Sequence, residues 1–474
     1  MSVSTPVPGR IEGISTPAPQ RRHLPAPLAA AMLGFFVVAL DAQVVNVALP
    51  GIRADLGGGL SGLQWVVTGY TLMFSALLLF GGTFSDRAGA RRAYGAGMVV
   101  FVAASAACGL APSLGFLVAA RLVQGAGAAL VTPTSLALIR EAYHDPGRRA
   151  RAIAYWAMGG SVAAAAGPVL GGALSQLDWR LIFFLNLPAG ALALAVLTRV
   201  GASPRRAVPF DWTGQTCAVL ALAALTYAII EGGKQGYASA PILVAFAVAI
   251  AASAAFLVAQ ARGRRPMLPL EMFRSRAVAI LLAAGFIGMV GFYGTVFLQS
   301  LYFQQLRGES PLATGLLFLP MTGLVAALNP AAARTAARFG PGVPIIGGQL
   351  VMAAGLAGLC LAPAHAPALL IAALMIPVGV GGSFTVPPIR AAPRQRPRRA
   401  GRHRQRGPEH RPPDGRLPGR GSLRRHHRRP GQFPARPAHQ LPDRGGPADH
   451  HLRCERNLAP RHPLTHYHAR RHRL

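Results

Sequence analysis

The sequence has few charged residues for its length. Asp, Glu, Lys and Arg make up 14% of its 474 residues, whereas 52% are hydrophobic. A soluble domain is on average about 25% charged, so this composition excludes an ordinary soluble enzyme, and the apolar content excludes a disordered chain. The apolar residues form blocks of 18–24 residues, and a membrane-spanning helix needs about 20. The sequence therefore predicts an all-α, polytopic membrane protein.

Cysteine is also scarce. The chain has four, at Cys108, Cys217, Cys360 and Cys454, without a CxxC pair or a His at ligand spacing. This pattern indicates neither a disulfide framework nor a metal site, and we interpret the three cysteines in apolar segments as small core residues. A Walker A motif is missing too, so ATP hydrolysis within this chain is not expected. We also expect no cofactor and no enzymatic activity.

Twelve helical spans can be placed along the first 387 residues, joined by short linkers. We expect them at residues 27–49, 62–82, 93–111, 115–138, 152–175, 180–199, 214–231, 240–260, 277–300, 312–332, 343–361 and 366–387. Short linkers make neighbouring spans antiparallel, so the spans must pack as a bundle. Gly and Ala are frequent in them, and small residues allow helices to approach closely inside a membrane.

Basic residues are distributed unevenly between the linkers. Alternate linkers, beginning with the N-terminal segment, hold 20 Lys and Arg residues, and the other linkers hold 4. By the positive-inside rule, this bias places the N terminus in the cytoplasm. Residues 1–26 are rich in Pro, Ser and Arg, and we expect a disordered cytoplasmic tail without a cleaved signal peptide. The expected location is the cell membrane, and 47 Arg against 1 Lys indicates a GC-rich bacterial source.

Asp41 and Arg121 are charged residues inside predicted spans. Asp41 is eight residues from the outer end of the first span, and Arg121 is six residues into the fourth, which places them ~12 Å and ~9 Å from the same membrane face. Charged groups in a membrane must face the bundle interior, so we expect the two to meet, with Gln124 one turn away. The pair is either a static ion pair that fixes packing or a site that binds and releases protons, and we favour the second, since carriers take up protons on buried carboxylates.

The linker after the second span combines charges with a glycine. Its residues of interest are Gly82, Asp86, Arg87, Gly89, Arg91 and Arg92. The arginines are either topology signals or part of a cytoplasmic latch, in which Asp86, just beyond the span, pairs with a linker arginine and Gly89 permits a tight reversal. The linker after the tenth span keeps the Arg-x-Gly pattern but has Ala337 in place of the aspartate, which suggests two related halves.

The fifth span carries a motif of helix breakers and small residues, at Gly167, Pro168, Gly171 and Gly172. Proline removes a helical hydrogen bond, and glycine lets another backbone approach. We expect a kink, and whether the motif also seals a proton path stays open. Four further polar residues either line a cavity or satisfy neighbouring helices: Tyr70, Tyr293, Gln299 and Asn329.

Together these segments resemble the major facilitator superfamily, and within it the fourteen-helix drug:proton antiporter branch. The motifs that carry the resemblance lie at residues 40–50, 65–70, 82–92, 121–127, 167–172 and 179–188. They occur in order at the expected helices, and the resemblance covers roughly residues 28–388. Gln43, Ala90 and Ala163 depart from the family's usual Thr, Arg and Gly.

The resemblance implies a major facilitator fold of two pseudo-symmetric helix bundles. The N-terminal six-helix bundle would occupy residues 27–199, two extra linking helices residues 200–276, and the first four helices of an incomplete second bundle residues 277–387. It implies proton-coupled export of small lipophilic or cationic drugs or antibiotics by alternating access. The energy source would be the proton gradient, and the protein would be a monomer in the lipid bilayer.

Site residues follow from the same resemblance. It implies a proton-coupling role for Asp41, Arg121, Gln124 and Asn46, a gating role for the 82–92 linker, and an antiporter motif at residues 167–172. A uniporter or importer of another small solute is the alternative within transporters.

The last 87 residues differ from the rest of the chain. They carry 23 Arg against 5 acidic residues and 11 of the 14 His. They form either a nucleic-acid-binding tail on a membrane anchor, a tether to anionic lipid, or the product of a reading-frame error. We favour a non-native, frameshifted tail at residues 388–474, because codons allowed for this segment can be chosen so that reading them one nucleotide later gives two apolar, helix-like segments. No nucleic-acid partner is then expected, and the chain as written would lack part of its second bundle and could be inactive.

Overall fold

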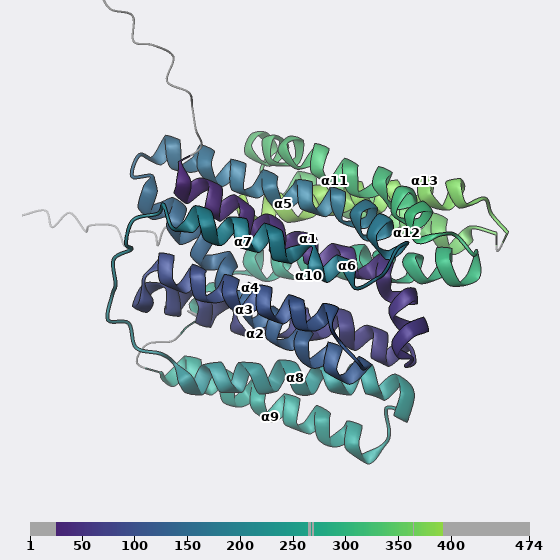
Figure 1. Cartoon of the computed structure of the whole chain (residues 1–474), viewed down its shortest axis with the longest axis horizontal. Helices are drawn as coiled ribbons and strands as arrows, with labels where there is room; N and C mark the ends of the chain where they lie inside the picture. The colour runs from purple at the N-terminus through teal and green to yellow at the C-terminus, as the bar shows by residue number, and fades with distance from the viewer. Residues whose placement is uncertain (1–24, 264–266, 268–269, 364, 392–474) are drawn as a thin grey trace, which may run out of the picture. The chain divides into compact units, whose positions relative to one another are not determined.

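Apolar α-helices form nearly all the regular structure that the computed structural model describes, which covers residues 25–263, 267, 270–363 and 365–391 (Figure 1). The helices are α1 (Ala26–Leu56), α2 (Leu60–Ala88), α3 (Ala90–Gly109), α4 (Leu114–Ala142), α5 (Pro146–Ser175), α6 (Leu181–Phe184), α7 (Asn186–Leu197), α8 (Trp212–Gln235), α9 (Ala240–Arg262), α10 (Arg276–Leu301), α11 (Pro311–Phe339), α12 (Gly342–Leu361) and α13 (Ala368–Ala391). A short 3₁₀ helix, η1 (Leu270–Arg274), and a π-helical turn, η2 (Tyr302–Leu306), complete the set.

The all-α membrane fold expected from the sequence is confirmed. Within the described residues, eleven helices are long and apolar enough to cross a membrane, and Leu181–Leu197 forms a shorter apolar segment. Each of the twelve predicted spans coincides with one of these helices or with that segment. The sixth span is divided between α6 and α7, which was not expected. Of the tails expected at residues 1–26 and 388–474, residues 1–24 and 392–474 lie outside the described residues. Helix α1 already begins at Ala26, and α13 continues to Ala391, four residues into the second of these tails.

Most helices are longer than the predicted spans, and polar side chains cap the start of several of them, namely α4, α5, α8 and α11. The Asp145 carboxylate accepts a hydrogen bond from the Arg148 backbone N–H at 2.8 Å at the start of α5, and Ser310 caps α11 in the same way at 3.1 Å. Such side chains satisfy N–H groups that have no partner inside the helix. The apolar run alone therefore gives the spans but underestimates the helices.

Helices α1 to α7 pack together (Figure 1). Helix α4 packs against α2 and α3, and α1 packs against α4, α5 and α7. Glycine makes the closest approaches possible: a Cβ on Gly125 of α4 would collide with the Tyr70 carbonyl of α2, and a Cβ on Gly127 would lie 2.6 Å from the Phe101 backbone nitrogen of α3. This close packing brings the polar residues of α1, α3 and α4 to one point.

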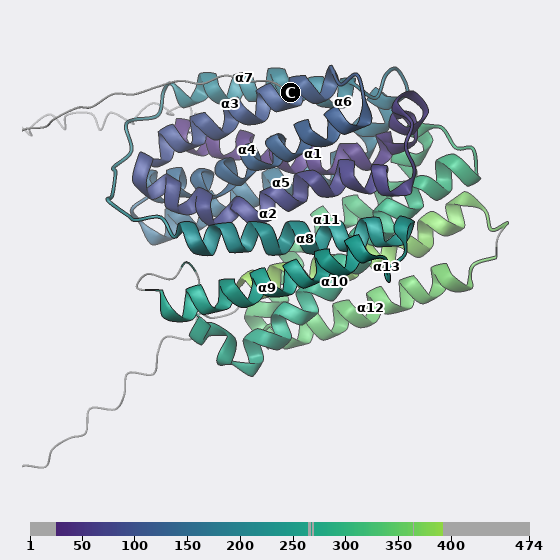
Figure 2. The same cartoon turned by 90° about the horizontal axis from the view of Figure 1, so that it is seen from below.

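Helices α8 and α9 pack on each other, and α8 also packs against α2 (Figure 2). Two hydrogen bonds attach α8 to α2. Gln215 Nε2 donates to the Ala76 carbonyl at 2.7 Å, and Trp65 Nε1 donates to Glu231 Oε1 at 2.9 Å. The α8–α9 pair is therefore held to the first group of helices by specific polar contacts as well as by apolar packing.

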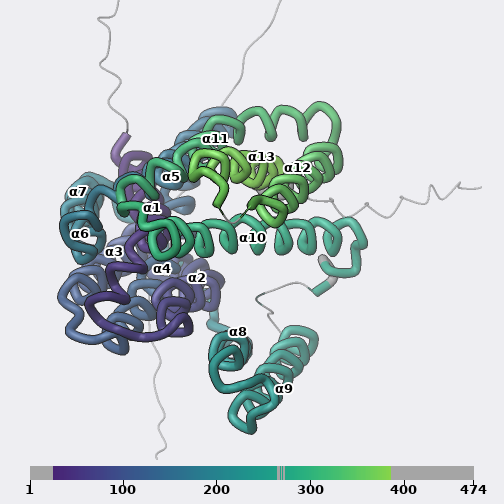
Figure 3. The backbone as a smooth tube through the Cα atoms, turned by 90° about the vertical axis from the view of Figure 1, so that its right-hand side faces the viewer, coloured from purple at the N-terminus to yellow at the C-terminus, as the bar shows by residue number. Residues whose placement is uncertain are grey.

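Helices α10 to α13 form a second group, in which α13 packs against α11 and α12 (Figure 3). This group meets the first through α11, which lies along α5, and through α10, which touches α1. The two contacts between the groups run along the same helices that carry the motifs of the first and fifth spans, so these motifs lie where the halves of the protein meet.

Candidate functional site

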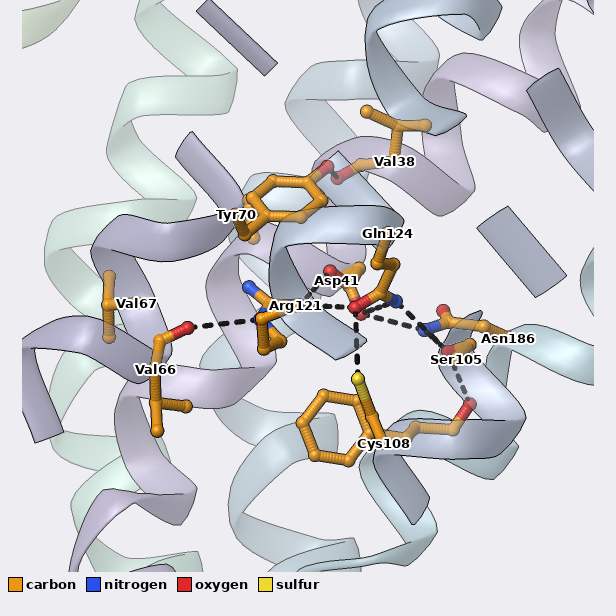
Figure 4. A network of polar contacts seen from close by, with 12 residues as sticks. Val38, Asp41, Val66, Val67, Tyr70, Ser105, Cys108, Arg121, Gln124 and Asn186 are labelled. Carbon is orange, nitrogen blue, oxygen red and sulfur yellow. Dashed lines mark hydrogen bonds and ion pairs between the residues drawn. The ribbon is translucent and has the colours of Figure 1, made fainter. Parts of the chain in front are cut away.

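Asp41, in the middle of α1, is completely buried and paired with Arg121 of α4 (Figure 4). Arg121 Nη1 lies 2.5 Å from Asp41 Oδ2 and donates a second hydrogen bond to Gln124 Oε1 at 2.7 Å. The Arg121 side chain is only 1% exposed. The structure thus brings together the two charged residues that their similar predicted depth in the membrane had paired, with Gln124 beside both.

The other carboxylate oxygen of Asp41 is also occupied. Its Oδ1 accepts hydrogen bonds from Gln124 Nε2 at 2.9 Å and from Asn186 Nδ2 of α7 at 2.8 Å. Both amides also donate to Ser105 Oγ of α3, at 3.0 and 2.9 Å. Three donors therefore hold the Asp41 carboxylate, which is what a charged group needs to remain in an apolar interior.

Arg121 is fixed from the α2 side. Its Nε donates to the Val66 carbonyl at 3.1 Å, and its Cζ lies 4.3 Å from the centre of the Tyr70 ring. The Tyr70 hydroxyl in turn donates to the Val38 carbonyl of α1 at 3.1 Å. The guanidinium group therefore contacts a carboxylate, an amide, a carbonyl and an aromatic face, all buried in the first group of helices.

This arrangement constrains what a proton on Asp41 would do. Protonation would remove the negative charge that compensates Arg121, and a buried charge without its partner is strongly destabilising. A proton can therefore bind Asp41 only together with a rearrangement of Arg121 and the amides around it. Such a network has the chemistry needed to link proton binding to a change in helix packing.

Asn46 lies outside this network. Its side-chain amide donates to its own helix, to the Ala42 carbonyl at 3.3 Å. Its backbone carbonyl accepts a hydrogen bond from Ser300 Oγ of α10 at 2.6 Å, and the neighbouring Val47 carbonyl accepts one from Gln304 at 2.9 Å. The sequence grouped Asn46 with Asp41, but the structure places it at a contact between the two groups of helices.

The small residues of the fifth span form a second contact of this kind. On one side of α5, a Cβ on Gly167 would collide with Gln43 of α1, and one on Gly171 would lie 2.7 Å from the Val44 carbonyl. On the other side, a Cβ on Gly172 would collide with the Pro311 carbonyl of α11, and the Pro168 carbonyl lies against Gly315. Glycines on both sides let α5 fit between α1 and α11.

A cavity of about 470 Å³ lies between the two groups of helices. Its walls come from α1, α2, α4 and α5 on one side and from α10, α11 and α13 on the other. Three of the polar residues singled out in the sequence line it, namely Tyr70, Tyr293 and Asn329, whereas Gln299 is not among the described lining residues. Tyr70 thus forms part of the cavity wall and also covers Arg121.

The linker after α2 differs from its prediction in one respect. Asp86 lies within the last turn of α2, which continues to Ala88, and its carboxylate makes no ion pair with any described residue. Its backbone carbonyl instead accepts a hydrogen bond from the Arg206 backbone N–H at 2.8 Å. The expected Asp86–arginine pair is therefore wrong for this conformation, because the α7–α8 linker occupies the loop.

The same linker contacts three of the other loop residues. Arg87 Cζ lies 5.1 Å from the Phe210 ring centre, and the Arg91 backbone N–H donates to Ser203 Oγ at 3.0 Å. Gly89 has a φ of 87° and approaches the Ser203 carbonyl, which agrees with the tight reversal expected there. Arg92 is exposed, and Gly82 faces open space.

The turn recurs between α11 and α12, where Gly340 has a φ of 81°. Gly89 and Gly340 each directly follow a helix, at Ala88 and Phe339, and precede the start of the next. This geometry supports the repeat suggested by the two Arg-x-Gly linkers.

Two residues of the buried network were not assigned a role from the sequence. Asn186 was noted only within the 179–188 motif, and Ser105 was not singled out. The position of Asn186 in its span was a usable signal. It lies five residues after the start of α6 at Leu181, so its depth below the membrane face is similar to that of Arg121. Ser105 gave no such signal, since a lone serine in an apolar helix commonly bonds its own backbone.

The family of this chain follows from its sequence relatives. Residues 31–403 match the family model described as Major Facilitator Superfamily. The chain belongs to the Major Facilitator Superfamily. It is therefore a multi-pass membrane transporter of small molecules and not an enzyme, as the motifs had indicated.

The curated relatives of this superfamily member include antibiotic resistance proteins. The multidrug resistance protein Stp of Mycobacterium tuberculosis is 39% identical over 76% of this chain and 68% of its own length. The methylenomycin A resistance protein of Streptomyces coelicolor is 36% identical over 81% of this chain and 82% of its own length. The tetracenomycin C resistance and export protein of Streptomyces glaucescens is 35% identical over 73% of this chain and 65% of its own length.

Solved structures of similar fold are transporters as well. A peptide transporter of the POT family in complex with sulfate matches with a TM-score of 0.57 at 18% identity, over 78% of this chain and 82% of its own. A D-xylose–proton symporter matches with a TM-score of 0.54 at 15% identity, over 77% and 81%. At these identities the likeness establishes the fold.

Proposed function

We propose that this transporter exports small lipophilic or cationic drugs or antibiotics across the cell membrane in exchange for protons, by alternating access. One observation carries the proposal: the cavity between the two groups of helices and the buried Asp41–Arg121 pair share a wall residue, Tyr70. The relatives that are named for drug resistance and export support the direction of transport.

Tyr70 provides the route between drug and proton. A drug in the cavity contacts the Tyr70 ring, and the same ring covers the Arg121 guanidinium. A displacement of the ring alters the position of Arg121 and so changes how well it compensates the charge of Asp41. Because coupling is reciprocal, proton binding to Asp41 must then change drug affinity by the same factor.

The contacts between the halves support one specific conformation. Apart from the Asn329–Ser161 hydrogen bond in the cavity wall, the halves touch at Asn46 and Val47 of α1 and at Gly172 of α5. These residues lie beyond those of α1 and α5 that line the cavity. With the N terminus in the cytoplasm, these contacts close the outer end, so the cavity lies on the cytoplasmic side of the seal. Drug would therefore enter from the cytoplasm and leave after the α5–α11 and α1–α10 contacts separate.

The test is drug transport in inside-out membrane vesicles with an imposed proton gradient. We expect gradient-dependent uptake by the wild type and none by Asp41→Asn. Asp145→Asn is the matched control, since Asp145 is exposed and caps α5, and Asn caps a helix equally well. Equal transport with and without the gradient would contradict the exchange and favour a uniporter. Accumulation in the opposite direction would favour an importer.

A further inference from the structure

The cavity between the two groups of helices, called the central cavity below, has an uncharged wall. None of its described lining residues is Asp, Glu, Lys, Arg or His. The walls combine aromatic rings with neutral polar groups such as the Gln43 amide and the Asn329 amide. A permanent cation that enters such a cavity loses its water without meeting a carboxylate, and this desolvation opposes binding.

The nearest carboxylate on α1 cannot replace a missing counter-ion. Asp41 is fully buried, and its two oxygen atoms already accept hydrogen bonds from Arg121, Gln124 and Asn186. A cationic drug would have to displace Arg121 to reach it. Such a drug would also approach a wall backed by a guanidinium group, which lies 4.3 Å from the Tyr70 ring centre.

Aromatic faces can attract a cation, but the Phe35, Trp156 and Tyr70 rings of this cavity already have partners. Trp156 stacks on Phe35 with ring centres 3.9 Å apart, and one Tyr70 face is used by Arg121. These rings present apolar surface for a flat, neutral molecule more than an open cage for an ammonium group.

Neutral hydrogen-bonding groups are available in the same cavity. The Gln43 amide lines it and makes no hydrogen bond within the described part of the chain. Asn329 Nδ2 donates to Ser161 Oγ at 3.1 Å, and both residues line the cavity. An amide of this kind can donate to a carbonyl and accept from a hydroxyl of a bound molecule.

We infer that the substrates are uncharged molecules with aromatic or apolar surface and a few carbonyl or hydroxyl groups, and that permanent cations are discriminated against. This inference rests on the proposed export function and narrows it to one class of drug. The distinction lies in the cavity and not in the proton site, so the two can be tested separately.

The test uses a matched pair of compounds. An uncharged aromatic compound is chosen from those to which expression of the chain gives resistance, and its trimethylammonium derivative is the second probe. Binding to the purified full chain is followed by quenching of tryptophan fluorescence, since Trp156 lines the cavity. We expect the neutral probe to bind at least about tenfold more tightly, which corresponds to ~1.4 kcal/mol.

Cavity carboxylates should reverse this preference. Gln43→Glu places a charge on the wall without removing a hydrogen bond, and we expect it to raise cation affinity at least about tenfold. Asn329→Asp does the same from α11 and provides a second variant should the first fail to fold. Gln176→Glu, at an exposed position after α5, makes the same chemical change outside the cavity and should leave the preference unaltered.

The outcomes separate the two proposals. Cation binding as tight as neutral binding in the wild type overturns the inference, while gradient-driven export in vesicles would still stand. Cavity carboxylates that fold but leave cation affinity unchanged also overturn it. If no compound gives resistance and neither probe is transported, the export function fails and the inference fails with it.

Discussion

The Tyr70 ring lies 4.3 Å from the Arg121 guanidinium carbon and forms part of the wall of the central cavity. One side chain thus contacts both the space where a substrate would bind and the only buried ion pair among the described residues. A drug bound in the cavity can therefore act on the Asp41–Arg121 pair through the Tyr70 ring.

Tyr70 variants test that path. Tyr70→Phe keeps the ring over Arg121 and loses only the hydroxyl bond to the Val38 carbonyl, so we expect export to fall less than about fivefold, given ~1 kcal/mol for such a bond. Tyr70→Leu removes the aromatic face, and we expect gradient-driven export to fall at least about tenfold, or ~1.4 kcal/mol. Transport rates in vesicles measure both. Equal effects of the two variants would contradict a role for the ring.

The buried pair makes a distinct prediction about stability. Arg121→Gln leaves Asp41 buried without its counter-ion, and we expect a loss of ~3–5 kcal/mol in the free energy of unfolding. The double variant Asp41→Asn, Arg121→Gln replaces the pair by neutral amides and should be more stable than Arg121→Gln alone. Thermal unfolding in detergent measures this.

Transport by the same double variant separates a static pair from a proton site. If the pair only fixes packing, a folded double variant should still show drug export that is driven by the proton gradient. We expect a folded but uncoupled protein.

The stability measurement has its own contradicting outcome. If the losses in Asp41→Asn and Arg121→Gln simply add in the double variant, Asp41 and Arg121 are not directly paired.

The outer contact between the halves depends on Gly172. Valine at this position would collide with the Pro311 carbonyl of α11, so we expect the α5–α11 contact to open and export to be lost. The measurement is labelling of Ser300→Cys by a membrane-impermeant thiol reagent, in a background without the native cysteines. Ser300 is buried at the α1–α10 contact, which we expect to open together with the α5–α11 contact.

The matched control for Gly172→Val is Gly347→Val on α12. A Cβ on Gly347 meets nothing within 4 Å, so labelling at position 300 should stay low. Faster labelling in both variants would indicate general loosening and would contradict a specific seal at Gly172.

Gly89, between α2 and α3, and Gly82, inside α2, have opposite expectations. Gly89 has a φ of 87° and lies near the Ser203 carbonyl, and an L-residue in this region costs roughly 1–2 kcal/mol. Gly89→Ala should therefore lower the unfolding temperature. Gly82 is helical with nothing within 4 Å, so Gly82→Ala should be neutral or stabilising by up to ~1 kcal/mol. Similar shifts for both would contradict the turn geometry.

Parts of the fold and site were predictable from the sequence for a clear reason. Charges inside apolar spans must find partners, so counting residues from the span ends was enough to pair Asp41 with Arg121. Asn186 and Ser105 are uncharged, and their positions in the network depend on how α3 packs against α4 and how α7 packs against α1. That packing is set by glycines such as Gly127, whose contacts no single helix reveals.

The loop prediction failed for a related reason. The sequence placed Asp86 beside three arginines and predicted an ion pair, but the α7–α8 linker provides backbone and aromatic partners at the same place. Asn46 was grouped with Asp41 because the resemblance to the family's first-helix motif covers both residues, although the two contact different partners. Local charge patterns could not predict either tertiary contact.

The most direct test of the account is proton release on drug binding. Purified wild-type chain in weakly buffered solution is mixed with a compound to which it gives resistance, and the pH change is recorded. If Asp41 exchanges its proton for drug, binding draws molecules with a protonated Asp41 into the state in which the carboxylate is ionised and paired with Arg121, so the wild type releases protons on mixing. Asp41→Asn, which still binds the compound, releases none. Equal proton release by the two proteins would contradict the assignment of Asp41 as the proton site.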